Sequence, residues 1–534
     1  MKTSFQWLVL GAALAFAAIY TAEGFLFKDY NLDEFQVATG YLKDRDPGMY
    51  SADFVWSKAE MVRNLHVSVR RLMQFTEFIT GGILSEPIDL FLLWLPICQA
   101  IFFVGIYLLA SRFTGDRWAS FLIACSFMLT RRILWDWWGL GPTYTMSARG
   151  PVLSCLPLML WWYFRCEGRL TWLIPSFLIW GGISNLHPLS GWGAVELLGV
   201  TLLVADRFRW RAWREGLVMG VCTLVGSSYF ISQWIQVAVV PEGQQATGAV
   251  ARDFLAQFGG LTPPTRKYLL SFLQDVSLPL ILSLWGFWRW RKSASSPPSD
   301  ERSLRVLYLF PLVTVVMTIL VMAGGYTMRG AGFSVPIMVA EHSRNIKMIY
   351  LTMSVWMAFA LSFWMRDHAR TLPKWGVPIV LVLALMCINF PGHKLVNHLL
   401  YSLRWTTARE IQSHQKRLDE DRADYEVAAW SRANTPKEAL FYFDSYEFRY
   451  YSRRSLVFCW FDRPCVGYHP SKELEEWIRR QDRVMPLRKT GDSRSMWNAA
   501  REFGADYLVV LNAWPALGEK PVWSNAKYSI YRLK

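Results

Sequence analysis

Long apolar runs recur from residue 5 to residue 391, and they constrain the fold of this chain more than any other feature. Hydrophobic residues make up 53% of the sequence, and the runs approach the length that crosses a hydrocarbon core. The runs are continuous, whereas transmembrane β-strands alternate apolar and polar residues. We therefore predict a polytopic α-helical membrane protein with about 11 transmembrane helices. The predicted spans are 5–21, 88–110, 118–130, 151–164, 171–184, 191–205, 216–237, 268–288, 306–324, 346–365 and 375–391.

Every second loop between the predicted spans is basic. The loops 112–117, 164–169, 206–214, 289–305 and 366–374 carry 16 Lys or Arg against 6 Asp or Glu. Short basic loops remain on the cytoplasmic side of a membrane. The N-terminus is therefore predicted to be cytoplasmic. The net charge of +15 follows from this topology and does not indicate a nucleic-acid partner.

The same alternation assigns the remaining loops and the C-terminal region to the extracytoplasmic side. The first apolar segment is predicted to be an uncleaved span, although Lys2 and the apolar run after it also fit a cleavable signal peptide. Either interpretation leaves residue 25 onward outside. The chain contains no Asn-x-Ser/Thr acceptor site, which fits a protein of a bacterial inner (plasma) membrane.

Three regions follow from this topology. Residues 1–87 form the first span and a long extracytoplasmic loop. Residues 88–391 form the transmembrane bundle, which a Ser- and Pro-rich cytoplasmic linker at 289–305 interrupts. Residues 392–534 form an extracytoplasmic α/β domain, because helical and strand-like patterns alternate there.

The predicted elements of the C-terminal domain have clear boundaries. Long polar or amphipathic helices are expected near 405–433, after Ser471 and at "SRSMWNAAREFG"; strands are expected at 438–444, 454–461, 505–512 and "KYSIYRLK". The domain has no Walker motif and no GxGxxG, so a nucleotide-binding function has no support.

Cysteine spacing gives little indication of a metal site. Six of the eight cysteines lie in or beside predicted spans, where they serve as packing residues. Cys459 and Cys465, in "CWFDRPC", lie outside the membrane and are close enough in sequence to form a disulfide or to remain free thiols. No CxxC pair or HExxH motif is present, so no structural zinc is expected.

The first extracytoplasmic loop is rich in carboxylates. "NLDEFQVATGYL" predicts a helix that Asn31 caps, with Asp33 and Glu34 in its first turn, where the helix dipole favours negative charge. "DPGMYSAD" predicts a turn, and a chain that folds back there would bring Asp53 toward the acidic pair. These residues form either a helix start or the acidic group of an active site.

Other extracytoplasmic loops contribute cations. The candidates are Arg149 in "TMSARG", His187 in "NLHPLSGW" and Arg344 in "AEHSRNIK". Guanidinium groups bind phosphate oxygens, and a carboxylate can take a proton from a hydroxyl. Together the loops suit a phosphate-linked lipid substrate. Each residue also has a structural interpretation: His187 can cap a helix, and Arg149 can anchor one at the interface.

A second mixed cluster lies in the C-terminal domain. "SYEFRYYSRRS" (445–455) carries four aromatic residues and three Arg after a predicted strand. Such side chains suit sugar stacking or contact with a polyanion. We favour packing instead, with Phe448, Tyr450 and Tyr451 holding the domain against the bundle.

The acidic first loop, the many spans and the C-terminal α/β domain resemble the GT-C superfamily of membrane glycosyltransferases. "DRDPGMYSADF", "SNLHPLSGW" and "NTPKEALFYFDSYEFRYYSRRSLVFCWFDRPC" resemble a bacterial family of uncharacterised multi-spanning membrane proteins, which implies no activity. The GT-C resemblance implies transfer of a sugar from a polyprenyl-phosphate donor to a glycan, lipid or protein acceptor. It also implies membrane lipid as a partner.

The resemblance assigns the general base to Asp33 or Glu34, with Asp53 as the runner-up or a supporting residue. Arg149, His187 and Arg344 become the candidates that bind the donor phosphate. The acidic pair here is "LDE", whose flanking residues differ from those of the best-known GT-C enzymes. No cofactor is required, although the carboxylates are compatible with a divalent cation.

Two other functions remain open. A non-catalytic scaffold of the cell envelope could keep this fold without its chemistry. A lipid or solute transporter is disfavoured, because the predicted spans contain few ionisable groups besides Glu196 and Asp275 and show no inverted repeat.

Overall fold

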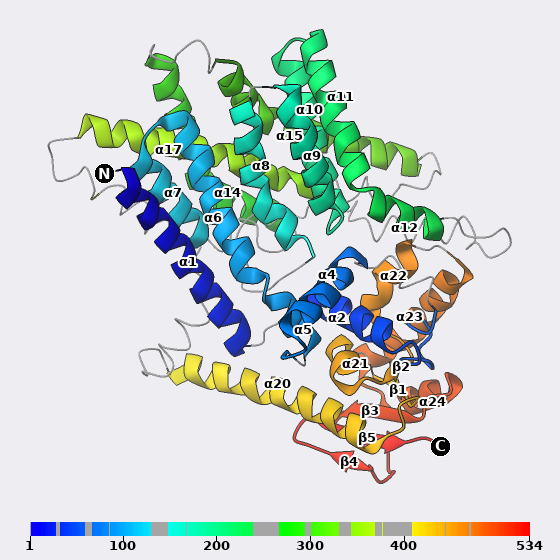
Figure 1. Cartoon of the computed structure of the whole chain (residues 1–534). Coiled ribbons are helices and arrows are strands. Elements are labelled where there is room, and N and C mark those ends of the chain that lie inside the picture. Colours follow the sequence, from blue (N-terminus) through cyan, green and yellow to red (C-terminus); the bar gives the residue numbers. More distant parts are fainter. Residues whose placement is uncertain are drawn as a thin grey trace. The chain divides into compact units, whose positions relative to one another are not determined.

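The computed structural model describes residues 2–27, 32–58, 67–84, 86–129, 148–166, 168–238, 266–293, 301–330, 343–368, 376, 408–443, 445–468 and 471–534. These residues are mostly helical and include one small mixed sheet near the C-terminus (Figure 1). The chain divides into two compact units. The bundle unit comprises Met1–Asp29, Phe91–Ile231 and Gly259–His393; the α/β unit comprises Tyr30–Leu90, Ser232–Phe258 and Lys394–Lys534.

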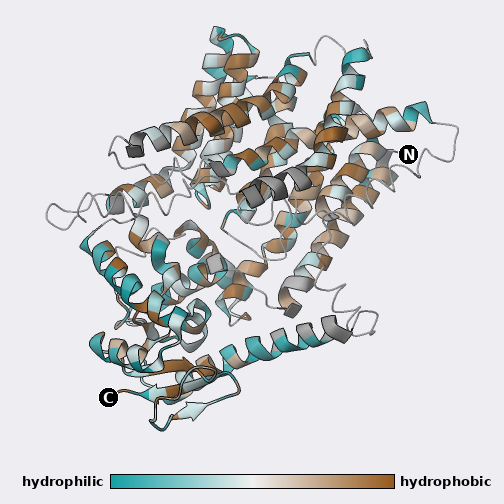
Figure 2. Ribbon diagram, turned by 180° about the vertical axis from the view of Figure 1, so that it is seen from behind, coloured by the Kyte–Doolittle hydropathy of each residue, from teal (hydrophilic) through white to brown (hydrophobic). Residues whose placement is uncertain are grey.

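Helices make up the described part of the bundle unit. They are α1 (Lys2–Phe27), α6 (Leu95–Thr114), α7 (Arg117–Leu129), α8 (Gly150–Cys166), α9 (Leu170–Ser184), α10 (Pro188–Ala205), α11 (Trp210–Gly226), α14 (Arg266–Lys292), α15 (Glu301–Gly330), η2 (Ser343–Met348) and α17 (Ile349–Asp367). The short α5 (Pro87–Leu92) and α12 (Ser228–Ala238) run across the boundaries between the units. The helices of the bundle unit carry mostly hydrophobic residues (Figure 2).

Five described helical segments are long and apolar enough to cross a membrane. They are Ser4–Ala22, Pro87–Thr114, Pro188–Ala205, Glu301–Gly325 and Asn345–Asp367. A sixth span is formed if α11 and the start of α12, which meet at a bend of 63°, act together. An integral membrane protein is therefore supported by length and composition.

Several predicted spans correspond to shorter or bent helices. Predicted span 118–130 is the short α7, and 171–184 is α9, which has only 15 residues. The run 216–237 is interrupted by the bend after α11. Predicted span 375–391 lies outside the described residues apart from residue 376.

Small residues let α9 and α11 approach closely. A Cβ placed on Gly181 would lie 2.3 Å from the carbonyl oxygen of Thr223, and one on Gly226 would lie 2.3 Å from that of Leu178. Asn185 of "NLHPLSGW" stabilises the bend after α11, because its side-chain amide donates a hydrogen bond to the Gly226 carbonyl at 2.9 Å. Close contact between small residues is a common way to pack helices in a membrane, because the hydrophobic effect does not drive helices together in lipid.

A buried ion-pair cluster lies within the bundle unit. The Glu215 side chain is fully buried and accepts hydrogen bonds from Arg211 at 2.9 Å, Arg302 at 3.0 Å and Tyr163 at 3.0 Å. Gly168 leaves room for this carboxylate, because a Cβ there would lie 2.2 Å from a Glu215 oxygen. A buried carboxylate needs such partners to offset the loss of hydration.

The α/β unit combines the segment after α1 with the C-terminal region. Its helices are α2 (Leu32–Arg45), α4 (Val67–Thr80), α20 (Ala408–Asn434), α21 (Tyr446–Ser452), η3 (Trp460–Asp462), α22 (Arg463–Tyr468), α23 (Lys472–Thr490) and α24 (Ser493–Glu502). Its strands are β1 (Leu440–Tyr442), β2 (Ser455–Leu456), β3 (Tyr507–Leu511), β4 (Trp523–Ser524) and β5 (Tyr528–Arg532).

The sheet has the order β2-β1-β3-β5-β4. Strands β2, β1 and β3 are parallel, with Phe441 opposite Tyr507, whereas β5 runs antiparallel to β3, with Leu508 opposite Tyr531. The four residues from Tyr507 to Val510 are buried in succession, as expected of a strand covered on both faces. The long α20, by contrast, is mostly hydrophilic (Figure 2).

The C-terminal elements agree closely with the sequence patterns. A helix fills most of 405–433, strands occupy parts of 438–444 and 505–512, and α23 follows Ser471. The predicted strand 454–461 is much shorter: only Ser455–Leu456 pairs, and the rest turns into η3. Ser471 stands at the N-cap of α23 without a capping hydrogen bond from its side chain.

Candidate functional site

The acidic helix of the first loop forms as predicted. Helix α2 begins at Leu32, so Asp33 and Glu34 lie in its first turn, while Asn31 and the Asp33 side chain lie outside the described part of the chain. Glu34 is buried, with an exposed fraction of 1%. The neighbouring Phe35 packs against Tyr450 and Tyr451, with ring centroids 5.5 and 5.6 Å away. The carboxylate of Glu34 therefore belongs to the folded interior of the α/β unit.

The far end of α2 is held by charged side chains. Asp44 pairs with the buried Arg70 of α4 at 2.8 Å. Burial lowers the pKa of Arg70, and Asp44 opposes that shift. Gly40 makes room for Arg70, because a Cβ there would lie 2.7 Å from its Cδ. These contacts fix the helix on α4.

The predicted turn after α2 is confirmed. The Gly48 amide donates to the Asp46 side chain at 3.1 Å, and the Met49 amide donates to the Asp46 carbonyl at 2.9 Å. Lys437, from the segment before β1, pairs with the Asp46 carboxylate. The hydrogen bonds lower the pKa of Asp46, that from Lys437 most. The turn leads the chain directly toward Asp53.

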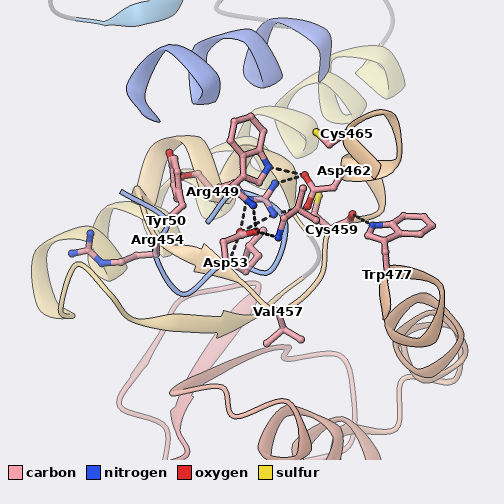
Figure 3. A network of polar contacts seen from close by, with 12 residues as sticks. Tyr50, Asp53, Arg449, Arg454, Val457, Cys459, Asp462, Cys465 and Trp477 are labelled. Atoms are coloured by element: carbon pink, nitrogen blue, oxygen red, sulfur yellow. Dashed lines mark hydrogen bonds and ion pairs between the residues drawn. The ribbon is translucent and has the colours of Figure 1, made fainter. Parts of the chain in front are cut away.

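Asp53 lies in a buried network that joins the first loop to the C-terminal region (Figure 3). One carboxylate oxygen accepts the backbone amides of Val55 and Trp56, each at 3.0 Å. The other accepts the Leu456 amide at 3.0 Å and two nitrogens of Arg449, Nε at 3.0 Å and a terminal nitrogen at 2.9 Å. Both oxygens are therefore saturated by donors.

Arg449 is the centre of this network. Its guanidinium is fully buried and donates to both oxygens of Asp462, at 2.6 and 2.7 Å, in a bidentate pair (Figure 3). The Trp56 indole also donates to Asp462 at 2.8 Å, and its ring lies 5.6 Å from the guanidinium. One cation thus bridges two carboxylates that are 409 residues apart in sequence, from Asp53 to Asp462.

Burial and charge act in opposite directions on these groups. Burial lowers the pKa of Arg449, but the two carboxylates outweigh it and hold the pKa well above its ordinary value. Burial raises the pKa of Asp462, and the guanidinium opposes that rise. A buried pair of this geometry is costly to break, because removing one member leaves an uncompensated charge. Asp53 is therefore positioned to support the fold of the first loop.

The predicted phosphate-binding residues all belong to the bundle unit. His187 is the N-cap of α10, and its Nδ1 accepts a hydrogen bond from the Ser190 amide at 3.3 Å. This contact agrees with the structural interpretation of His187 as a helix cap. Arg149 is half-buried and directly precedes α8. Arg344 lies in η2, and its side chain lies outside the described residues.

The aromatic and Arg cluster after β1 packs within the α/β unit. Phe448 contacts Phe441 and Phe443, with ring centroids 5.0 and 5.2 Å away. The Tyr450 hydroxyl donates to Glu86 at 2.9 Å. These contacts lie within the α/β unit and join the cluster to the first loop and the domain core. Phe448 and Tyr450 are buried, so their rings are not exposed for stacking on a sugar.

Neither a disulfide nor a metal cluster is present among the described residues. Cys459 and Cys465 are buried and are not joined by a disulfide (Figure 3). Burial raises the pKa of Cys465 well above its ordinary value, so the thiol is protonated at neutral pH. No group of three His, Cys, Asp or Glu side chains in the described ranges could hold a metal ion.

Sequence reasoning missed the partnership of Arg449 with Asp53 and Asp462. The signal available in the sequence was weak. Arg449 is a charged residue inside an aromatic-rich stretch, and the residues that follow have the apolar pattern of a buried strand.

The comparisons with known proteins add no family. No protein-family model matches the chain, and no curated protein matches it.

Proposed function

We propose that this chain is a GT-C-type glycosyltransferase of a bacterial inner membrane. It would use about 11 spans, with the N-terminus in the cytoplasm and the α/β unit on the outer face. The observation that carries the proposal is the first turn of α2, where Glu34 is buried beside Asp33 immediately after the first membrane-spanning helix. A carboxylate removed from water there can act as a base on an acceptor hydroxyl.

The proposed reaction balances without a cofactor. Asp33 or Glu34 takes the proton of the acceptor hydroxyl while that oxygen forms a bond to the anomeric carbon of the donor sugar. The bond from this carbon to the phosphate oxygen breaks, and its electron pair leaves with polyprenyl phosphate. Arg149, His187 and Arg344 are the residues proposed to stabilise the departing phosphate.

The helix dipole supports the assignment of the base to α2. The N-terminal end of a helix carries partial positive charge, which favours the ionised form of a carboxylate in its first turn. Asp53 is proposed only as a supporting residue, because its oxygens already accept five donor nitrogens. Its role is to hold the loop that carries α2.

The same saturation of Asp53 favours a second candidate, a non-catalytic scaffold of the cell envelope. In a scaffold, the buried charges would serve only to join the first loop to the C-terminal region. The two functions differ in what the carboxylates of α2 do.

Amide substitutions test this difference. We expect Glu34→Gln or Asp33→Asn to abolish a surface glycan in cells that lack the unmodified protein, while the amount of inserted protein is unchanged. Glu420→Gln, on the exposed face of α20, is the matched control and should leave the glycan unchanged. Normal glycans in cells that carry Asp33→Asn together with Glu34→Gln would favour the scaffold.

A further inference from the structure

A cavity of about 340 Å³ lies within the C-terminal part of the α/β unit. Its volume falls in the range of small-molecule sites, about 300–1,000 Å³. Tyr442 and Phe443, at the end of β1, line one side, and Leu511 and Trp514, at the end of β3, line another. The cavity is therefore located at the carboxyl ends of two adjacent parallel strands.

This position is a topological switch point of the sheet. After β1 the chain passes through α21 and forms β2, which pairs with one side of β1. Strand β3 pairs with the other side of β1. The chain leaves β3 in the opposite direction, toward β5 and β4. Loops that diverge in this way leave a crevice at the strand ends, and ligands of open α/β sheets bind there.

Aromatic rings form the apolar walls of the cavity. Phe443 and Tyr528 meet edge to face, with centroids 5.3 Å apart. The half-buried Trp514 lies against Gly491, the left-handed C-cap of α23, where a Cβ would come within 2.8 Å of the indole. The missing side chain at Gly491 thus gives Trp514 its place in the wall. Rigid aromatic faces bind flat apolar surfaces at low entropic cost.

The polar lining contains two carboxylates and two cations. Asp424 pairs with Lys527 at 2.8 Å, and Glu447 and Arg488 also line the cavity. Burial raises the pKa of Glu447, and the nearby carboxylates of Asp424 and Asp421 raise it further. The formal charges of the four lining groups cancel, so the cavity does not favour a ligand with several negative charges.

We propose that this cavity binds one saccharide unit, with a C–H face of the ring against Trp514 and hydroxyl groups on Glu447 and Arg488. Carboxylates accept and guanidinium groups donate hydrogen bonds, so together they match hydroxyls, which do both. Besides its hydroxyl groups, a pyranose ring presents an apolar C–H face, and the aromatic wall of the cavity complements that face. The site uses no residue of α2, and saccharide binding there does not depend on transfer activity elsewhere in the chain.

Saturation-transfer NMR on the full chain tests the proposal with methyl glycosides of glucose, galactose, mannose, rhamnose and N-acetylglucosamine. The protein is held in lipid nanodiscs, because maltoside and glucoside detergents would themselves supply sugar rings. We expect at least one glycoside to bind. Its Kd should rise about tenfold in Glu447→Gln, which keeps the side-chain shape but loses a charged acceptor, and in Trp514→Ala.

Matched controls separate the cavity from the rest of the unit. Trp460→Ala removes an exposed Trp outside the cavity lining, and Glu438→Gln removes an exposed carboxylate outside it. Both should bind the glycoside as the unmodified protein does. Thermal unfolding of all four variants reports whether the fold is retained, and the isosteric Glu447→Gln keeps the test valid if Trp514→Ala unfolds.

Three results would overturn the proposal. The first is that no glycoside of the set gives a transfer signal with the unmodified protein. The second is equal binding by the unmodified protein and Glu447→Gln. The third is tighter binding of inorganic phosphate, measured by ³¹P line broadening and lost in Arg488→Gln, which would assign the cavity to an anion.

Discussion

Replacing Arg449 with Met is predicted to open the α/β unit. The substitution keeps much of the side-chain length but removes the cation that Asp53 and Asp462 share, and all three side chains are at most 1% exposed. Loss of one member of a buried ion pair costs about 3–5 kcal/mol of unfolding free energy. Since each 1.4 kcal/mol is a factor of ten, the open population should rise roughly a hundred- to a few-thousand-fold.

Buried thiols report this opening directly. Cys459 and Cys465 are each 1% exposed, so maleimide reaches them only when the unit opens. The labelling rate is measured by mass spectrometry of the peptide that contains both cysteines, which separates it from the thiols of the bundle unit. The rate should follow the open population when reclosing is faster than labelling.

Two further variants decide the cause of the change. Arg479→Met removes an exposed arginine that pairs with Glu476 and Glu502, and surface pairs contribute only about 0–1 kcal/mol, so labelling should rise less than about fivefold. Adding Asp53→Asn and Asp462→Asn to Arg449→Met removes the stranded charges and should recover part of the protection. Labelling of Arg449→Met at the rate of Arg479→Met would refute the reasoning.

Two other predictions rest on single contacts, and a third rests on the proposed membrane topology. Partial burial raises the pKa of Glu473, but the hydrogen-bonded ion pair with Lys58 is among the contacts that lower this pKa to about 2. The carboxylate therefore stabilises the unit above about pH 4.5 and loses its effect as the pH falls toward 2. Lys58→Met should remove this pH dependence, about 1 kcal/mol, from the unfolding free energy of the α/β unit measured at a series of acidic pH values; an unchanged pH profile would contradict it. Gly168→Ala should destabilise the bundle unit by about 1–3 kcal/mol, because φ is +74° and the new Cβ would meet Glu215, and an unchanged thermal unfolding temperature would contradict it. A reporter enzyme inserted within 294–300 should be cytoplasmic and one fused after the last residue extracytoplasmic; the reverse pattern would overturn the topology.

Local patterns predicted the local elements of this protein. Alternating and helical periodicity placed α20, α23, α24, β3 and β5, because each depends on residues that are near in sequence. The turn at Asp46 was also predictable, since its own side chain accepts the Gly48 amide. The short β2 was overestimated, because apolar residues continue into η3 although pairing with β1 ends.

Contacts between distant segments could not be predicted in the same way. Nothing near Asp53 in the sequence indicates that Arg449, 396 residues away, would donate two hydrogen bonds to its carboxylate. The same carboxylate looked equally suited to a catalytic role, since acidic residues in an external loop are common to both interpretations. Only the saturated oxygens of Asp53 separate support from chemistry. The cavity at the ends of β1 and β3 was likewise hidden, because it depends on the strand order.

Lipid extracts give the most direct test of the central proposal, that a carboxylate in the first turn of α2 acts as the base in the transfer of a lipid-linked sugar. Cells that carry only Glu34→Gln or Asp33→Asn are compared by mass spectrometry with cells that carry the unmodified protein or Glu420→Gln. We predict that a polyprenyl-phosphate-linked sugar accumulates with at least one α2 variant and not with Glu420→Gln. Identical lipid extracts from all four, with the double variant Asp33→Asn and Glu34→Gln also unchanged, would contradict the account.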